Sequence, residues 1–279
     1  MMPARKIAIR KTLLKRLYIA KGMSTYKIGD YLGCSASTVE SRLEEFGIPK
    51  KSASLARMRY AKKDFKGLPT YRAYMIGFRM GDLNVYQTSP HAETVVVRCH
   101  TTQQEQVEVL EGLFAKFGKV STSQNGGHYH VNCFLNRSFS FLMAKDKSVF
   151  GALENSDEQA AFTAGYTDAE GNFIINQGRA RFKIDSYDKE VLDFIAVFLS
   201  QTGVSFKLRR ISNAGDTQYI RGVPALYPQD LWRLNINEGR ALLRFVEMLK
   251  PFLRHRTRIR DMKKCEVNIT RRIHHGTTK

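Results

Sequence analysis

Apolar positions recur with a helical period through the first fifty residues, and polar capping signals divide this stretch into three short helices. A second helix is predicted over residues 24–32, with Ser24 as its N-cap, and a third over residues 36–46, closed by Gly47. The pattern predicts a small all-α domain at residues 1–52. The apolar stripe of the first helix consists of Leu13, Leu14, Leu17 and Tyr18.

The second and third helices are joined by a tight turn at residues 33–35 and resemble a helix-turn-helix. In such a unit Ile28 faces Val39, and the third helix enters the DNA major groove with its first polar residues. A plain three-helix bundle with a polar outer face is the alternative interpretation. The candidate DNA contacts are Ser35, Ser37, Thr38, Ser41 and Arg42.

Lysine and arginine are dense in residues 53–69, and a break follows at residues 67–69. This stretch predicts a basic linker, either a solvated helix or an arm along a phosphate backbone. Residues 266–279, which include Arg271 and Arg272, predict a flexible basic tail.

Strand-like and helical patterns alternate in the same order twice between residues 70 and 262. The first half has a strand at 94–101, a helix at 104–117, a turn at 124–127 and a strand at 128–134. The second half has strands at 173–175 and 180–185, a helix at 191–199, strands at 206–210 and 231–236, and a helix at 240–249. Each half is predicted to be an αββαββα unit of an α+β fold, at residues 70–152 and 153–265.

Each half begins with an apolar helix that carries small residues four apart and ends in an acid. The small residues are Gly77 and Gly81 in residues 73–82, and Ala161, Gly165 and Ala169 in residues 161–170. Small residues at this spacing lie on one helix face and let two backbones approach closely. Packing the two helices with their ends matched therefore brings Asp82 and Glu170 together.

Two carboxylates at helix C-termini repel each other and face the negative ends of two helix dipoles. A divalent cation relieves this repulsion, and Mg2+ prefers one or two carboxylates completed by water and phosphate oxygens. The pair thus predicts phosphodiester hydrolysis, in which metal ions activate a water and stabilise the leaving oxygen. The alternative is that both acids simply end their helices in solvent.

Composition points to a polyanionic partner. The 279 residues carry a formal net charge of +19 and an isoelectric point near 9.9. No apolar run reaches the roughly 18 residues of a membrane span, and no apolar block of a secretory signal follows the basic N-terminus. The four cysteines are scattered along the chain, which is typical of a protein in a reducing compartment. We expect a protein of a reducing compartment, the cytoplasm and nucleoid or an organellar matrix, with no membrane partner.

These motifs resemble the LAGLIDADG homing endonucleases in their single-chain, two-motif form. The resemblance implies a pseudo-twofold pair of units whose two antiparallel sheets form a saddle over the DNA major groove. It assigns metal binding to Asp82 and Glu170, with the adjoining Gly81 and Ala169. It also implies double-strand cleavage that leaves 3′ overhangs.

A third similarity concerns the cations of the site. Residues 249–256 resemble a family segment of the form P-F-L-x-x-K, whose last basic residue stabilises charge at the cleaved phosphate. The resemblance gives that role to Arg256, and the matching place in the first half nominates Lys145. An ordinary phosphate-positioning or surface cation is the alternative for each.

The sequence departs from the family pattern at several positions. Met80 stands where an acid is common and Leu83 where glycine is usual, whereas the second motif keeps Asp168 and Gly171. The polar residues expected at the ends of the second strands fall on Thr102 or Gln103, and on Ser186 or Tyr187.

Specificity is expected from cations on the strands, where Arg179, Arg181 and Lys183 alternate into one row. A row of solvated charges is the alternative. His128, His130 and Cys133 suggest a metal, but strand alternation with Tyr129 and Val131 inward explains them more simply. The strand cations are Arg98, Arg179, Arg181, Lys183, Lys207, Arg209, Arg210 and Arg233.

The sequence predicts a monomeric, Mg2+-dependent, site-specific endonuclease of double-stranded DNA, free-standing or intron-encoded. Mn2+ is expected to replace Mg2+, and Ca2+ to support binding without cleavage. One alternative is a DNA-binding transcriptional regulator that retains only the scaffold, and a further one is a helper of RNA splicing. The retained acids favour the nuclease, because two carboxylates aimed at a phosphate backbone repel it unless a cation lies between them.

Overall fold

The computed structural model describes residues 8–51, 60–220 and 222–276. The chain divides into two compact units, Met1–Arg59 and Tyr60–Lys279, which are described separately. Residue 52, residues 53–59 of the predicted linker and residues 277–279 of the predicted tail lie outside the described residues.

The first unit is a cluster of short helices around an apolar core. Ser24 and Ser35 cap α2 and α3, since each side chain accepts a hydrogen bond from the backbone N–H three residues later, of Lys27 and Thr38 respectively. The core includes Ile28 and Val39, both fully buried, as the helix-turn-helix interpretation requires. The elements are α1 (Lys11–Lys15), a π-helical turn (Arg16–Ala20), α2 (Thr25–Leu32) and α3 (Ala36–Glu45).

The turn between α2 and α3 depends on two glycines. Gly33 ends α2 in the left-handed conformation, with φ of 68°. Gly29 lies against the carbonyl oxygen of Cys34, where a side chain would clash. The predicted tight turn at residues 33–35 therefore rests on backbone contacts that larger residues do not permit.

The second unit begins with one helix and one antiparallel sheet, whose strand order is β1-β2-β4-β3. Along β2 the side chains alternate, so that Val95, Val97 and Cys99 are buried beneath the helices while His100 is exposed. The elements are α5 (Pro69–Asp82), β1 (Asn84–Tyr86), β2 (Thr94–Thr101), α6 (Gln104–Phe114), β3 (Lys119–Asn125), β4 (His128–Asn136) and 3-10 helices at Arg137–Leu142 and Lys147–Ala152.

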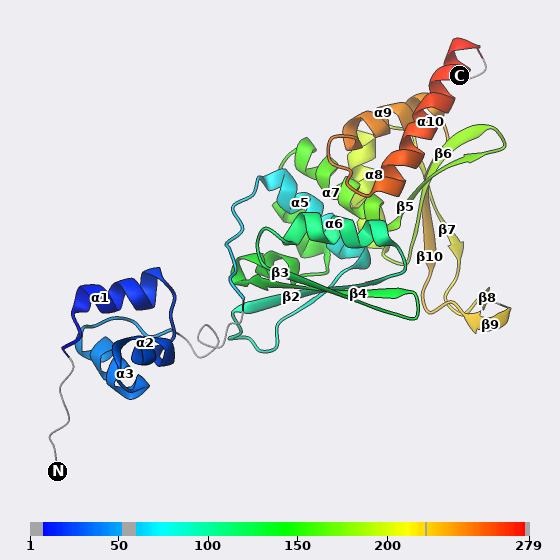
Figure 1. Ribbon diagram of the computed structural model, residues 1–279. Coiled ribbons are helices and arrows are strands. Elements are labelled where there is room, and N and C mark those ends of the chain that lie inside the picture. Colours follow the sequence, from blue (N-terminus) through cyan, green and yellow to red (C-terminus); the bar gives the residue numbers. More distant parts are fainter. Residues whose placement is uncertain (1–7, 52–59, 221, 277–279) are drawn as a thin grey trace. The chain divides into compact units, whose positions relative to one another are not determined.

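The rest of this unit repeats the arrangement, with a sheet of order β5-β6-β10-β7. The predicted repeat and α+β fold are confirmed, and the helices pack on one face of each sheet (Figure 1). The elements are α7 (Ser156–Glu170), β5 (Gly171–Asn176), β6 (Arg179–Ser186), α8 (Lys189–Gln201), β7 (Lys207–Ser212), β8 (Thr217–Ile220), β9 (Val223–Leu226), β10 (Leu231–Ile236), α9 (Gly239–Leu249) and α10 (Arg256–His274).

Four details differ from the sequence predictions. The first half closes with 3-10 helices instead of an α-helix, and a separate β8–β9 hairpin interrupts the second. Residues 256–274 form the long helix α10, so Arg271 and Arg272 are helical and the predicted flexible tail is wrong at these positions. Residues 60–68 are not helical; they pack on the first half, where Phe65 contacts the ring of Phe139.

No helix in the described ranges is both long enough and apolar enough to cross a membrane.

Candidate active site

Helices α5 and α7 contact each other backbone to backbone. A Cβ atom on Gly77 would clash with the carbonyl oxygen of Phe162, and one on Gly165 would clash with that of Tyr74. The small residues picked out in the sequence therefore lie at the helix crossing, as predicted. Because the two contacts are reciprocal, the C-terminal ends of the helices lie side by side.

Asp82 is the last residue of α5 and lies largely buried at this seam. Its carboxylate accepts a hydrogen bond of 2.6 Å from the Nε2 amide of Gln106, which in turn accepts one of 2.7 Å from the Thr101 hydroxyl. Burial raises the pKa of Asp82 above its ordinary value, against the opposing effects of Gln106, Arg258 and Lys145.

Glu170 is the last residue of α7 and adjoins Asp82 across the seam. Its side chain is so close to Gly81 that a Cβ there would lie 3.2 Å from its Cγ. Burial raises the pKa of Glu170, and the negative charge of Asp82 raises it further. The structure therefore brings the two predicted acids together, one from each half of the unit.

Two desolvated carboxylates of like charge form a site that fits a hard divalent cation. The donors are oxygens, and the carbonyl groups at the two helix ends, including Gly81 and Ala169, lie next to them. The described ranges contain no group of three or more His, Cys, Asp or Glu side chains that could hold a metal. A cation here would thus need water or phosphate oxygens as further ligands.

Lys145 and Arg258 are the cations whose charges lower the pKa values of both acids. Lys145, which the sequence nominates, is therefore near the pair. Arg256 is not: its side chain is 75% exposed and pairs with Glu108 of α6 at 3.1 Å. Arg258, which the sequence prediction missed, has a buried Nε atom with no hydrogen-bond partner within the described ranges.

Asp168, two residues before Glu170, joins the two halves to the segment that precedes α10. One carboxylate oxygen accepts hydrogen bonds from the Tyr74 hydroxyl at 2.7 Å, the Arg254 N–H at 2.7 Å and the His255 N–H at 3.1 Å. Burial raises the pKa of Asp168 to about 6 despite these donors. The corresponding residue of the first motif, Met80, is buried among apolar side chains instead.

The polar residue at the strand end differs from the predicted positions in the first half and is one of them in the second. In the first half Thr101, and not Thr102 or Gln103, connects through Gln106 to Asp82. In the second half Ser186 is hydrogen-bonded to the Tyr166 hydroxyl at 2.8 Å, whereas Tyr187 is exposed.

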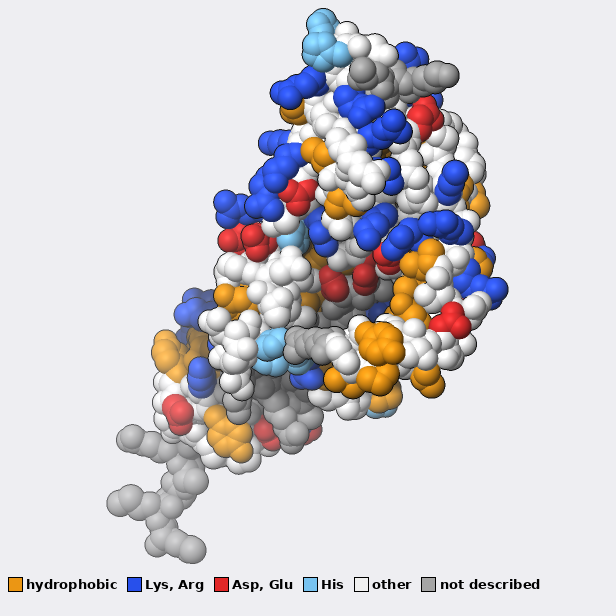
Figure 2. Space-filling view, turned by 90° about the vertical axis from the view of Figure 1, so that its right-hand side faces the viewer, with side chains coloured by type: hydrophobic (Ala, Val, Ile, Leu, Met, Phe, Trp, Pro, Cys, Tyr) orange, Lys and Arg blue, Asp and Glu red, His pale blue; other side chains and the backbone are white. Residues whose placement is uncertain are grey.

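Most of the predicted strand cations lie on the second sheet. Arg179 is exposed, and Arg181 and Lys183 are half-buried at alternate positions of β6, as the row requires. A small cavity of about 220 Å³ is lined by Arg181, Lys183, Arg209, Arg233 and Asn235, among others. In the space-filling view Lys and Arg side chains border a hollow in which acidic side chains are visible (Figure 2).

Acidic partners hold some of these cations in place. Asp185 accepts hydrogen bonds of 2.5 Å and 2.7 Å from Arg233 and pairs with Lys183 at 3.4 Å. Asp230 pairs with Arg210 at 3.0 Å. Asp185 is the next residue of the alternating row on β6, and its partner Arg233 comes from the neighbouring strand β10.

The first sheet carries Arg98, which is fixed by two neighbours on the same face. Asn132 accepts a hydrogen bond from its Nε at 3.0 Å, and the Tyr86 hydroxyl accepts one from its terminal nitrogen at 2.7 Å. Cys133 is fully buried, whereas His128 is exposed. The alternation that argued against a His–Cys metal cluster is therefore confirmed.

In the first unit several of the predicted DNA contacts already have partners. Ser35 caps α3 and bonds the hydroxyls of Ser37 and Thr38 at 2.8 Å and 2.9 Å. Arg42 pairs with Glu45, and Ser41 is exposed. The exposed face of α3 is thus polar at the predicted positions.

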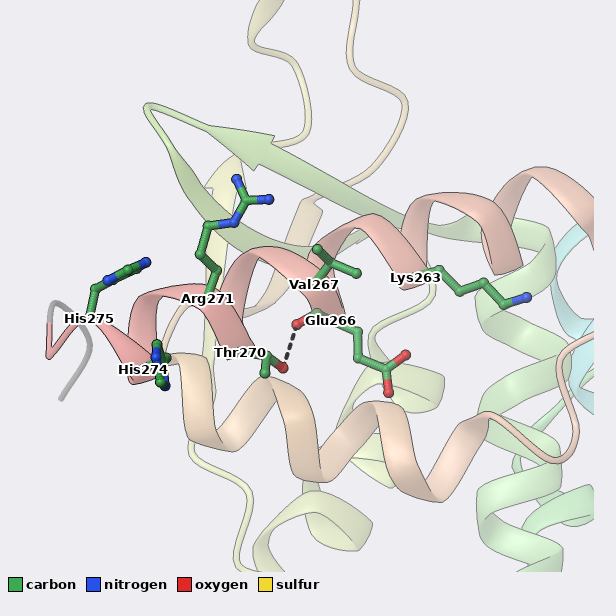
Figure 3. A pocket seen from close by; sticks show the side chains of 7 residues that line it. All are labelled: Lys263, Glu266, Val267, Thr270, Arg271, His274 and His275. Carbon is green, nitrogen blue, oxygen red and sulfur yellow. Dashed lines mark hydrogen bonds between the residues drawn. The ribbon is translucent and has the colours of Figure 1, made fainter.

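A larger hollow of about 650 Å³ lies along α10 (Figure 3). All of its lining residues belong to α10 or directly follow it, and only Val267 among them is apolar. None of the site residues described above lines it. The lining residues are Lys263, Glu266, Val267, Thr270, Arg271, His274 and His275.

The fold and the site define a two-repeat protein with one acid from each repeat at a shared helix seam. Residues 157–250 match the family model of the LAGLIDADG-like domain. The matched residues cover most of the second repeat. None of the curated proteins matches the chain significantly.

Solved structures with a similar fold include mesophilic variants of the homing endonuclease I-DmoI, at 18% identity over 65% of this chain and 95% of that one, with a TM-score of 0.45. The structure of I-DmoI in complex with DNA and Mn is 18% identical, over 66% of this chain and 97% of that one, with a TM-score of 0.46. Full-length DUF199/WhiA from Thermatoga maritima is 12% identical, over 75% of this chain and 62% of that one, with a TM-score of 0.47.

Proposed function

We propose that this chain is a site-specific endonuclease that hydrolyses both strands of double-stranded DNA with a divalent metal. The observation that carries this proposal is the half-buried pair of Asp82 and Glu170, one from each repeat, at matched helix ends. A protein that only binds DNA gains nothing from two desolvated carboxylates near a phosphate backbone.

Asp82 and Glu170 would hold the metal, with the carbonyl groups of Gly81 and Ala169 as neighbouring oxygen donors. When bound, Mg2+ supplies Lewis-acid stabilisation of the phosphate and lowers the pKa of a bound water. Lys145 and Arg258 lie close enough to shift both carboxyl pKa values, and their charges would stabilise the negative charge that builds up on the phosphate. Mg2+ is the expected ion, with Mn2+ as a substitute and Ca2+ supporting binding alone.

The open faces of the two sheets would bind the DNA. The second sheet offers Arg181, Lys183, Arg209 and Arg233 around one small cavity, and the first offers the oriented Arg98. An arginine fixed in place is suited to bidentate contact with guanine. The first unit would add contacts through the polar face of α3. One chain supplies both acids, so a monomer is sufficient.

Selection from a randomised duplex library tests the proposal. The wild-type chain in Mg2+ is expected to enrich double-strand breaks at one long sequence. The double variant Asp82→Asn, Glu170→Gln is expected to bind that sequence in Ca2+ but not to cut it in Mg2+. Breaks without a shared sequence, or equal cutting by the variant, would contradict the proposal.

A DNA-binding regulator is the second candidate, favoured by one observation. Met80 replaces the carboxylate that Asp168 supplies in the other motif, so the two halves of the site are not equivalent. Tight and specific DNA binding by the wild type, with no cleavage in Mg2+ or Mn2+, would establish this second function in place of the first.

A further inference from the structure

Two histidines face each other on the exposed side of the first sheet. His100 of β2 and His130 of β4 are paired directly across the two strands. Their Nδ1 atoms are 2.8 Å apart, and the rings stand at 90° with centroids 4.5 Å apart. Both side chains lie on the face opposite to the helices, because their sequence neighbours Cys99 and Val131 are buried on the helix-facing side and strand side chains alternate.

The short Nδ1–Nδ1 distance limits the protonation of the pair. One ring must carry a proton on Nδ1 and the other must offer a lone pair there, since two such protons would collide. In the tautomer that carries its proton on Nε2, each ring has a free lone pair on Nδ1. With both rings in that tautomer, a cation between them would gain two nitrogen ligands at once, and each imidazole would keep its proton on Nε2.

The geometry fits a transition-metal ion. Metal–imidazole bonds of about 2.0–2.1 Å place two nitrogens roughly 2.9 Å apart at a right angle and roughly 3.3 Å apart at a tetrahedral angle. The observed 2.8 Å requires the two rings to separate by about half an ångström or less. Imidazole nitrogen suits Zn2+, Ni2+ and Cu2+, whereas Mg2+ prefers oxygen.

We propose that His100 and His130 bind a divalent transition-metal ion of the Zn2+ class, in a site distinct from the carboxylate pair. The two sites lie on different faces of β2. Thr101, on the helix-facing side, bonds Gln106, which bonds Asp82, whereas His100 points to the opposite side. Two protein ligands leave coordination positions open for water.

A metal at this place would also join β2 to β4. These strands are the two central members of the sheet. Because the ion would bind only where both rings are held in register, its binding should stabilise the folded state. Thermal unfolding therefore reports on the site without any measurement of activity.

Calorimetric titration with ZnCl2 tests the proposal on the full chain. The adjacent His274 and His275 are exposed and are removed first, so that the parent for the titration is His274→Ala, His275→Ala. This parent is expected to bind one Zn2+ and to gain thermal stability with it. His100→Ala and His130→Ala on that parent should each weaken binding by about ten-fold or more, and abolish the gain.

Two controls make the test specific. His128→Ala removes an exposed histidine two residues from His130 on the same strand and should leave Zn2+ binding unchanged. Asp82→Asn, Glu170→Gln removes the carboxylate pair and should also leave it unchanged. Equal Zn2+ affinity in the parent and in the His100→Ala and His130→Ala variants would overturn the proposal, as would loss of binding in either control. Metal-free melting curves of each variant verify that it is folded.

Discussion

The hydroxyl of Tyr74 donates a 2.7 Å hydrogen bond to the carboxylate of Asp168, and this bond joins the two repeats inside the α5–α7 interface. Tyr74 and Asp168 are 1% and 2% exposed. The same carboxylate oxygen holds the backbone of Arg254 and His255, just before the helix that carries Arg258. One buried acid thereby fixes the helix interface and the segment that leads to the candidate active site.

Tyr74→Phe should lower the free energy of unfolding by about 1–3 kcal/mol, because a buried carboxylate loses a donor that water cannot replace. Chemical denaturation measures this change. Tyr71→Phe is the matched control, since that hydroxyl bonds the Leu113 carbonyl at 3.0 Å in a half-buried place. Its loss should be smaller, and equal losses in the two variants would argue against a special role for the Tyr74–Asp168 bond.

Gly77→Ala should destabilise the chain by about 3 kcal/mol or more, because the new methyl group would clash with the backbone of α7 and neither helix can yield without repacking. Gly112→Ala provides the control: Gly112 is also helical, and a Cβ there meets nothing within 4 Å. That change should be neutral or stabilise by up to about 1 kcal/mol. Thermal or urea unfolding distinguishes the two, and a mild effect of Gly77→Ala would show that the seam is looser than the structure indicates.

Asp185→Asn should make stability less dependent on pH in the acid range. Burial raises the pKa of Asp185, but the hydrogen bonds and charges of Arg233 and Lys183 outweigh it, so the pKa lies below its ordinary value of 3.8. A lowered pKa in the folded state means that the carboxylate contributes stability above pH 3.8 and loses it as the pH falls through the folded value.

The free energy of unfolding of the variant should thus be about 1 kcal/mol lower than that of the wild type at pH 7. This difference between the two proteins should become smaller below pH 3.8. Urea denaturation at a series of pH values measures it. Asp193→Asn removes an exposed pair with Lys189 and should change stability by less than about 0.5 kcal/mol. If the difference in unfolding free energy between the wild type and Asp185→Asn stays constant down to strongly acid pH, the ion-pair explanation is contradicted.

Two variants test which arginine serves the candidate active site. The structure favours Arg258, whereas the sequence resemblance favours Arg256, so Arg258→Gln and Arg256→Gln are compared. Arg258 acts on both carboxyl groups, whereas Arg256 pairs with Glu108. Under the proposed function, Arg258→Gln should slow single-turnover DNA cleavage by about 10²-fold and Arg256→Gln by only a few-fold. The reverse order would restore the role that the family resemblance gives to Arg256.

The sequence was sufficient for the features that depend on local periodicity. The spacing of Gly77 and Gly165 located the helix contact, and the acid at the end of each motif located Asp82 and Glu170, because both follow from which residues share one helix face. The strand alternation that places His128 outward and Cys133 inward was predictable for the same reason.

What the sequence could not provide depends on the path of the chain between elements. The charge of Arg258 acts on the carboxyl groups from α10, whose preceding backbone Asp168 holds, and a motif written as a spacing contains no such long-range relation. The β8–β9 hairpin was missed because Tyr219, Ile220 and Val223 are all exposed, so its apolar residues do not alternate between a buried and a solvated face. Asp185 was missed because its partner Arg233 lies on another strand.

The most direct measurement is the rate of double-strand cleavage of the selected DNA site, with Mg2+ present, by the wild type and by Asp82→Asn, Glu170→Gln. Binding of both proteins to the same site in Ca2+ serves as the control for folding and recognition. The account predicts cleavage by the wild type, no detectable cleavage by the variant, and similar binding by the two. Specific binding without cleavage by the wild type, in Mg2+ and in Mn2+, would contradict it.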